Sequence, residues 1–239
     1  MRPNIPVLAY HKIAEPSSYD ANPNTCVAPA AFETQMRLLR LAGYATPAPG
    51  EYLKARLGAP ADLPPKPVLI TFDDAFESVL TRALPVLRKN GFSAAVFMVA
   101  SAFGGSAFWD GESRESPNRL LDAAGLKELL GAGWTIGSHG VTHSDFRRLP
   151  AAGMAEEASR SKTALESALG SAVAWFAYPY GGYTEEAKRA VSGAGYELAF
   201  ATEKGDGGAF AVPRRVISGK SGVFNFALRL RQAAGMSAL

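Results

Sequence analysis

The chain has 239 residues, of which 47% are hydrophobic and 20% are charged, a balance that permits one sizeable buried core. Its 25 basic and 22 acidic side chains leave a net charge of +3, and no run of basic residues concentrates it, so no nucleic-acid partner is expected. The single cysteine, Cys26, excludes an intramolecular disulfide.

Short apolar segments alternate with helical patterns along the chain. Residues 5–10 form the first apolar segment, and a loop rich in Pro, Ser and Asn follows over 15–29. Residues 67–72 are predicted to be a buried strand because they are apolar, β-branched and preceded by two prolines. The other predicted elements are helices over 30–42, 78–90, 122–132, 151–169, 184–194 and 223–234, strands over 94–99, 134–138, 174–177, 198–200 and 215–217, an irregular segment over 101–118 and a turn over 178–182.

This alternation predicts the α/β class with a parallel sheet. About seven strand–helix units in a chain of this length favour a compact barrel and a single domain. In a barrel, functional residues lie at the C-terminal ends of the strands. Conspicuous polar residues follow three of the predicted strands, namely Asp73-Asp74, His139 and Tyr178-Pro179-Tyr180.

Two adjacent carboxylates, Asp73 and Asp74, end the strand over 67–72. One Asp at this place is typical of a helix N-cap, which is the structural alternative. Neighbouring side chains on a strand point to opposite faces, but at a strand-to-loop junction the chain can turn both carboxylates inward. The pair is therefore a candidate for a catalytic or metal-binding role.

Two of the three histidines, His139 and His143, are four positions apart. On a helical turn this spacing places both imidazoles on one face, where they can bind one ion. Two histidines and one carboxylate leave coordination positions open for water and substrate, as a catalytic metal site requires.

Three ordered motifs give the chain a family resemblance: Thr71-Phe72-Asp73-Asp74, then Ser138-His139-Gly140-Val141-Thr142-His143, then Tyr178-Pro179-Tyr180-Gly181. Together they resemble the polysaccharide deacetylase family with the NodB homology domain, carbohydrate esterase family 4. The resemblance extends from Ile5 to about Ile217 and implies a distorted (β/α)7 barrel, taken as one domain over 1–239.

The resemblance also implies roles for these residues. Asp73 matches the catalytic base, and Asp74, His139 and His143 match the ligands of a divalent metal. Zn²⁺ is the metal expected first, with Co²⁺, Ni²⁺ or Fe²⁺ as alternatives. Tyr180 matches the residue whose backbone N–H helps to form the oxyanion hole.

Two departures from the family pattern concern the partners of this site. The third motif usually begins with an Arg that pairs with the catalytic Asp, and this chain has Phe176-Ala177 there; Arg214 or Arg215 from a late strand are the candidate replacements. The general-acid histidine normally lies in a C-terminal motif, but none follows His143. The remaining histidine, His11, resembles the acid of the circularly permuted branch typified by biofilm poly-N-acetylglucosamine deacetylases; otherwise it is a loop histidine with satisfied hydrogen bonds.

The implied activity is metal-dependent removal of N-acetyl groups from an N-acetylglucosamine-type glycan, with release of acetate. Hydrolysis of another amide by the same barrel, such as a formamide or a small non-sugar amide, is one alternative, and a non-catalytic carbohydrate-binding homologue is another. The candidate substrate contacts are Trp109, Tyr178, Pro179, Arg214 and Arg215.

The chain shows neither an apolar stretch near the ~18 residues of a membrane span nor the apolar core of a signal peptide. A cytoplasmic location is expected for the sequence as it stands, and a periplasmic or extracellular one if a signal was removed. The oligomeric state is left open.

Overall fold

The computed structural model describes residues 5–17, 20, 22–111, 118–202, 205–219 and 223–235. Its centre is one curled sheet of seven parallel strands in the order β8-β7-β6-β5-β4-β1-β9, so that the first strand lies between β4 and the last strand. The strands are β1 (Val7–Tyr10), β4 (Leu69–Phe72), β5 (Ala95–Met98), β6 (Thr135–Ser138), β7 (Trp175–Ala177), β8 (Leu198–Phe200) and β9 (Arg215–Val216).

After β8 the chain forms a segment that runs parallel beside that strand before it reaches β1. The Ala201 N–H donates to the Val212 carbonyl at 2.9 Å, and Phe200 and Val212 form a parallel bridge. The chain then continues into β9, which pairs with β1. The predicted α/β class and distorted (β/α)7 barrel are thus confirmed; the extent of the domain, 1–239, stays a prediction.

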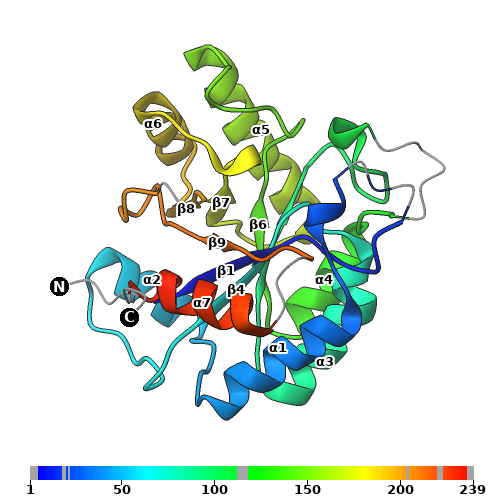
Figure 1. Ribbon diagram of the computed structural model, residues 1–239. Helices are drawn as coiled ribbons and strands as arrows, with labels where there is room; N and C mark the ends of the chain where they lie inside the picture. The colour runs from blue at the N-terminus through cyan, green and yellow to red at the C-terminus, as the bar shows by residue number, and fades with distance from the viewer. Residues whose placement is uncertain are drawn as a thin grey trace.

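Six of the described helices lie around the outside of the curled sheet. In Figure 1, α5 and α6 lie at the top of the view and α1, α3 and α4 at the lower right. Local signals set their ends: Asp122 accepts the Gly125 N–H at the start of α4, and Thr184 accepts the Ala187 N–H at the start of α6, as N-caps do. Among the described residues, no helix is both long and apolar enough to cross a membrane. The six are α1 (Pro29–Leu41), α3 (Leu84–Asn90), α4 (Ala123–Gly131), α5 (Ala151–Leu169), α6 (Glu185–Gly193) and α7 (Val223–Ala233).

The helix predicted over 78–90 forms as two pieces. A π-helical turn, η2 (Val79–Ala83), precedes α3, and the Leu84 N–H donates to the Val79 carbonyl five residues back. Pro85 has no N–H to donate and its ring crowds the preceding turn, which accounts for the wider turn at this place.

Three elements are absent from the sequence prediction: α2 (Pro49–Leu57), β2 (Lys12–Ile13) and β3 (Cys26–Val27). The two strands have two residues each, too few to show a period. Helix α2 buries only Tyr52, Ala55 and Arg56, so its sequence lacks an apolar stripe. It nevertheless covers the interior of the curled sheet, where Tyr52 packs on Trp175 and Phe200 with ring centroids 5.5 and 6.3 Å away.

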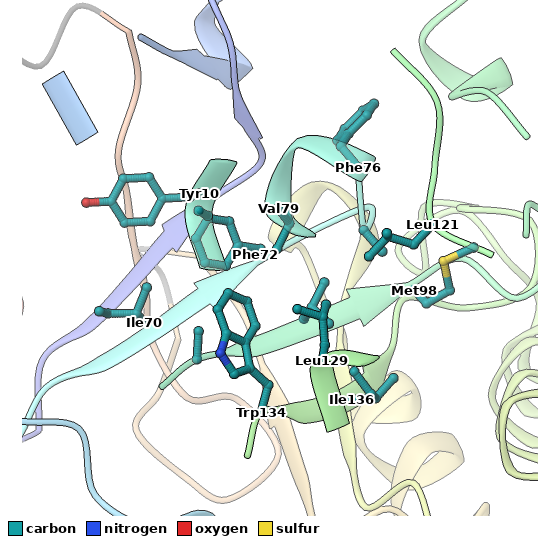
Figure 2. Packing of buried hydrophobic residues seen from close by; sticks show 14 of the residues in the cluster. Tyr10, Ile70, Phe72, Phe76, Val79, Met98, Leu121, Leu129, Trp134 and Ile136 are labelled. Atoms are coloured by element: carbon teal, nitrogen blue, oxygen red, sulfur yellow. The ribbon is translucent and has the colours of Figure 1, made fainter. Parts of the chain in front are cut away.

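The outer face of the sheet packs against the helices through large side chains (Figure 2). Phe72 lies between Tyr10 and Trp134, with ring centroids 5.6 and 5.7 Å away. Because side chains alternate along a strand, the neighbours of Phe72 point to the other face. Thr71 and Asp73 therefore face the interior of the barrel.

Candidate metal centre and catalytic site

The ends of β1, β4 and β6 bring the candidate residues together. Tyr10 pairs with Phe72 in the parallel register of β1 and β4, and the Asp73 N–H donates to the Tyr10 carbonyl at 2.9 Å. His11 and Asp73 are therefore the first residues beyond two adjacent strands. His139 continues β6, where its N–H donates to the Met98 carbonyl at 2.8 Å.

Asp74, His139 and His143 form a buried cluster whose ligand atoms lie within 4.8 Å of one another. Asp74 Oδ1 is 3.8 Å from Nε2 of His139 and 3.4 Å from Nε2 of His143. This oxygen is buried and has no hydrogen-bond partner among the described protein groups, an arrangement that is costly unless a cation compensates the charge. Two imidazoles and one carboxylate suit a divalent ion that keeps further positions open, so the donor set fits the metal that the sequence implied.

The His139–His143 segment is a loop, which corrects the predicted helical turn. Gly140 and His143 have φ values of 81° and 60°, in the left-handed region. The non-glycine residues with positive φ in the described chain are Asp74, Ala75, His143 and Tyr180. Such conformations are costly and gather at functional sites, and three of these four residues were predicted for the site.

His139 is oriented through its second ring nitrogen. Its Nδ1 lies 2.7 Å from the Ala177 carbonyl oxygen, which can only accept a hydrogen bond, so Nδ1 carries the proton and Nε2 is left to bind an ion. Burial lowers the pKa of His139 to about 4. The ring is therefore neutral at pH 7, as a metal ligand must be.

The ring of His143 is held by aromatic contacts instead. Trp109 stacks on it with centroids 4.6 Å apart and planes inclined by 17°. Tyr180 packs edge to face on it at 4.7 Å. Trp109 thus lies at the candidate metal centre, and its predicted contact with substrate stays a prediction.

Asp73 forms a bidentate ion pair with Arg214, at 2.7 Å to Oδ1 and 2.8 Å to Oδ2. Arg214 is only 1% exposed, so it positions Asp73 and is too deeply buried for the predicted substrate contact. Burial by itself raises the pKa of Asp73, but the charge and hydrogen bonds of Arg214, together with the nearby His139 and His11, outweigh it and hold the pKa below its ordinary value. Arg214, and not Arg215, therefore occupies the place of the missing motif arginine.

A cavity of about 250 Å³ connects these groups, and His11, Asp73, Asp74, His139, His143 and Tyr180 all line it. Nδ1 of His11 is buried without a hydrogen-bond partner in the described chain. Two further hollows, of about 750 and 610 Å³, adjoin it. The Tyr180 ring, 53% exposed, borders all three.

Three other predicted substrate contacts are placed differently. Tyr178 is fully buried and its hydroxyl donates to the Phe210 carbonyl, and Pro179 is buried beside it. A buried side chain cannot contact a glycan, so the structure does not favour either contact. Arg215 is half-buried on β9, and its role stays a prediction.

The loop after β1 also belongs to the site, which the sequence did not lead us to predict. Asn22, Asn24 and Thr25 line the same cavity as His11 and the metal donors. Loops that follow barrel strands build the functional face. The polar loop predicted over 15–29 follows the first strand, and this position could have marked it as part of the site. Thr202, Val216 and Ser218 also line the cavity, and no sequence pattern marks them.

Comparisons with known proteins agree with this arrangement. A family model described as polysaccharide deacetylase matches residues 61–199. The chain is 32% identical over 225 residues to YxkH of Bacillus subtilis (strain 168), a protein named as a polysaccharide deacetylase, with 91% of this chain and 73% of that protein covered.

Two solved structures of similar size also match. The Streptococcus pyogenes deacetylase PplD, solved in complex with acetate, has a TM-score of 0.78 and 25% identity, covering 95% of this chain and 97% of that one. IcaB from Ammonifex degensii has a TM-score of 0.76 and 26% identity, covering 96% and 97%.

Proposed function

The chain belongs to the polysaccharide deacetylase family, and we propose that it removes N-acetyl groups from an N-acetylglucosamine-type glycan with the help of a divalent metal. One observation carries this proposal. Three buried metal donors, Asp74, His139 and His143, lie beside a carboxylate, Asp73, that an arginine keeps ionised.

The two neighbouring carboxylates have different partners, which supports different roles. Asp74 lies against the two histidines, whereas both oxygens of Asp73 accept hydrogen bonds from Arg214. A carboxylate that stays ionised can accept a proton in the reaction. Asp73 is therefore the base of the proposed mechanism, and Asp74 is a metal ligand.

When bound, the metal supplies Lewis-acid polarisation of the acetamide carbonyl and lowers the pKa of water. Asp73 accepts the proton of the attacking water as the new carbon–oxygen bond forms. The backbone N–H of Tyr180 donates to the developing oxyanion; one such donor typically contributes roughly 3–4 kcal/mol. Protonated His11 then gives its proton to the sugar nitrogen as the carbon–nitrogen bond breaks, and acetate and a free amine leave.

The shape around the site supports an oligomeric substrate. The cavity at the metal donors shares Tyr180 with two larger hollows. An exposed aromatic ring at this junction gives a flat apolar surface to neighbouring sugar units. Zn²⁺ is the metal we propose, because its ligand preferences match this donor set.

The test is acetate release from N-acetylglucosamine oligomers by metal-stripped protein, with and without added Zn²⁺ or Co²⁺. We expect added metal to restore release in the wild type. Asp73→Asn is expected to bind metal but to release no acetate, and His11→Ala to lose release in the same way. Release that survives complete metal stripping would rule out the metal role.

The same assay separates the alternatives. N-formylated sugars and simple amides are offered in parallel, with formate and acetate measured separately. Hydrolysis confined to one of these would reassign the substrate, and glycan binding without hydrolysis of any of them would leave a carbohydrate-binding protein.

A further inference from the structure

The loop over residues 140–142 joins the two candidate histidine ligands, and they are held by different means. His139 is oriented by the contact of its Nδ1 with the Ala177 carbonyl. His143 has no equivalent contact, because its Nδ1 is buried without a hydrogen-bond partner among the described protein groups. The place of the His143 ring therefore depends on its stacking partners and on the backbone that carries it.

The loop backbone is held from two sides. The Gly140 and Val141 carbonyls accept hydrogen bonds from Ala100 and Ser101, and the Val141 and Thr142 N–H groups are bound by one side chain. Glu157 of α5 accepts the Val141 N–H at 2.8 Å and the Thr142 N–H at 3.0 Å on one carboxylate oxygen, Oε2. Its other oxygen, Oε1, accepts the Thr142 hydroxyl at 2.7 Å. Hydrogen bonds to an ionised acceptor are roughly twice as strong as neutral ones, so three of them anchor this short loop to a rigid helix.

The fit between Glu157 and the loop is tight. A Cβ atom at Gly140 would lie 3.0 Å from Oε2 of Glu157, and the φ of 81° at Gly140 also favours glycine. His143, at the end of the loop, has a φ of 60°. A non-glycine residue keeps such a conformation only when its surroundings impose it. Glu157 holds the N–H groups of the two preceding residues, and Ser101 holds the Val141 carbonyl.

We propose that Glu157 is a positioning residue of the metal centre, which fixes the loop so that His143 reaches the ion. The inference rests on the proposed function, because it assigns Asp74, His139 and His143 to a metal. Glu157 contacts the loop and not the cluster of donors, so its effect is on the geometry and affinity of the site.

Titration of metal-stripped protein with Co²⁺ tests the role of Glu157. The titration gives the affinity for the ion, and the visible absorption of bound Co²⁺ reports the geometry of its ligands. Three variants are compared with the wild type: Glu157→Ala, Glu157→Gln and the control Glu156→Ala. Glu156 is the neighbouring carboxylate on α5, 62% exposed, and it pairs with Arg160. Its removal changes the same helix and the same charge without touching the loop.

We expect Glu157→Ala to bind Co²⁺ about 10–100-fold more weakly, the range typical for groups that orient metal ligands, and to change the absorption band at saturating metal. Glu157→Gln should recover part of the affinity, since an amide oxygen can still accept the two N–H groups and its NH2 can donate to Thr142. Glu156→Ala should match the wild type.

The outcomes are distinguishable. A lower melting temperature of metal-stripped Glu157→Ala with unchanged Co²⁺ affinity and spectrum would overturn the inference, since Glu157 would then only stabilise the fold. If the Ala variant does not fold, the same comparison is made with Glu157→Gln. Absence of Co²⁺ binding by the wild type would overturn the metal centre of the proposed function, and the inference with it.

Discussion

The ion pair between Arg214 and Asp73 shows how one residue adapts this site. The guanidinium donates to both Asp73 oxygens and to the Ala201 carbonyl, and it lies 5.5 Å from the centroid of the Phe97 ring. A planar fork with five donors can make these contacts at once, whereas a lysine ammonium cannot. Arg214 therefore supplies a positive charge to Asp73 and also fixes the orientation of the Asp73 carboxylate.

Arg214→Met is expected to destabilise the protein by about 3–5 kcal/mol, because it leaves a buried carboxylate without its partner. Urea unfolding at pH 7 measures this. Arg214→Lys keeps the charge but loses the bidentate geometry, so we expect a roughly 10²-fold loss of kcat, the cost of a misplaced catalytic group. Arg215→Met is the control for stability, and an equal destabilisation there would contradict the assignment of Arg214.

At the scale of elements, the loop between β1 and α1 carries part of the site wall and is anchored by Asp20. The Lys12 ammonium lies 2.7 Å from Asp20 Oδ1, and Asn118 donates to the same oxygen at 2.9 Å. Asp20 also accepts the backbone N–H of Ser17. These contacts join β2, the loop and a segment distant in sequence next to the cavity that Asn22 lines.

This anchor predicts a dependence of stability on pH. Burial raises the pKa of Asp20, but hydrogen bonds from Lys12 and Ser17 outweigh it and lower the pKa to about 2. The unfolded chain takes up this proton first, so the stabilisation is present above about pH 4 and is lost as the pH falls towards about 2.

Asp20→Asn should therefore unfold at lower urea concentration than the wild type at pH 7, and the difference should shrink between about pH 4 and pH 2. Urea midpoints at a series of pH values test this. A difference that stays constant over that range would show that the carboxylate charge contributes nothing.

The packing of helix α2 leads to a second prediction about stability. Tyr52 is fully buried against Trp175 and Phe200, yet its hydroxyl has no hydrogen-bond partner among the described protein groups. A buried hydroxyl without a partner costs free energy, so Tyr52→Phe should leave the stability unchanged or increase it.

Tyr52→Ala leaves a cavity and should cost about 3–5 kcal/mol. Thermal and urea unfolding of both variants provide the measurement. If the Phe variant were as unstable as the Ala variant, the hydroxyl would have a partner that the packing does not reveal.

At the scale of the whole molecule, the strand order brings segments from the first and the last strand of the sheet to the site. The match to the family model covers residues 61–199, which include neither His11 nor Arg214. Because β1 lies between β4 and β9, His11 arrives beside Asp73 from the first strand, and Arg214 arrives at the start of the last.

The proposed metal also predicts a whole-molecule effect. An ion that binds only the folded state stabilises it, by about 4 kcal/mol at a concentration 1,000 times its Kd. We therefore expect Zn²⁺ to raise the melting temperature of metal-stripped protein. His143→Ala removes one ligand and should abolish most of this rise; a rise of equal size in that variant would place the ion elsewhere.

The sequence by itself determined the alternation of elements, the parallel barrel and the candidate ligands. An apolar segment before Asp73-Asp74 marks the end of a buried strand, and the ordered motifs carry the family resemblance that made Asp74, His139 and His143 candidate ligands. Helix ends followed from residues such as Asp122 and Thr184, whose hydrogen bonds are made within a few positions.

Only the tertiary structure decided which distant residues meet. Arg214 and Asp73 are 141 positions apart, so nothing local distinguished Arg214 from Arg215. The contact of Glu157 with the histidine loop, the burial of Tyr178 and the packing of α2 inside the sheet likewise depend on how the sheet curls. That curl is set by strand pairing and side-chain packing between segments far apart in the chain. A local sequence pattern does not specify which distant segments pair or pack.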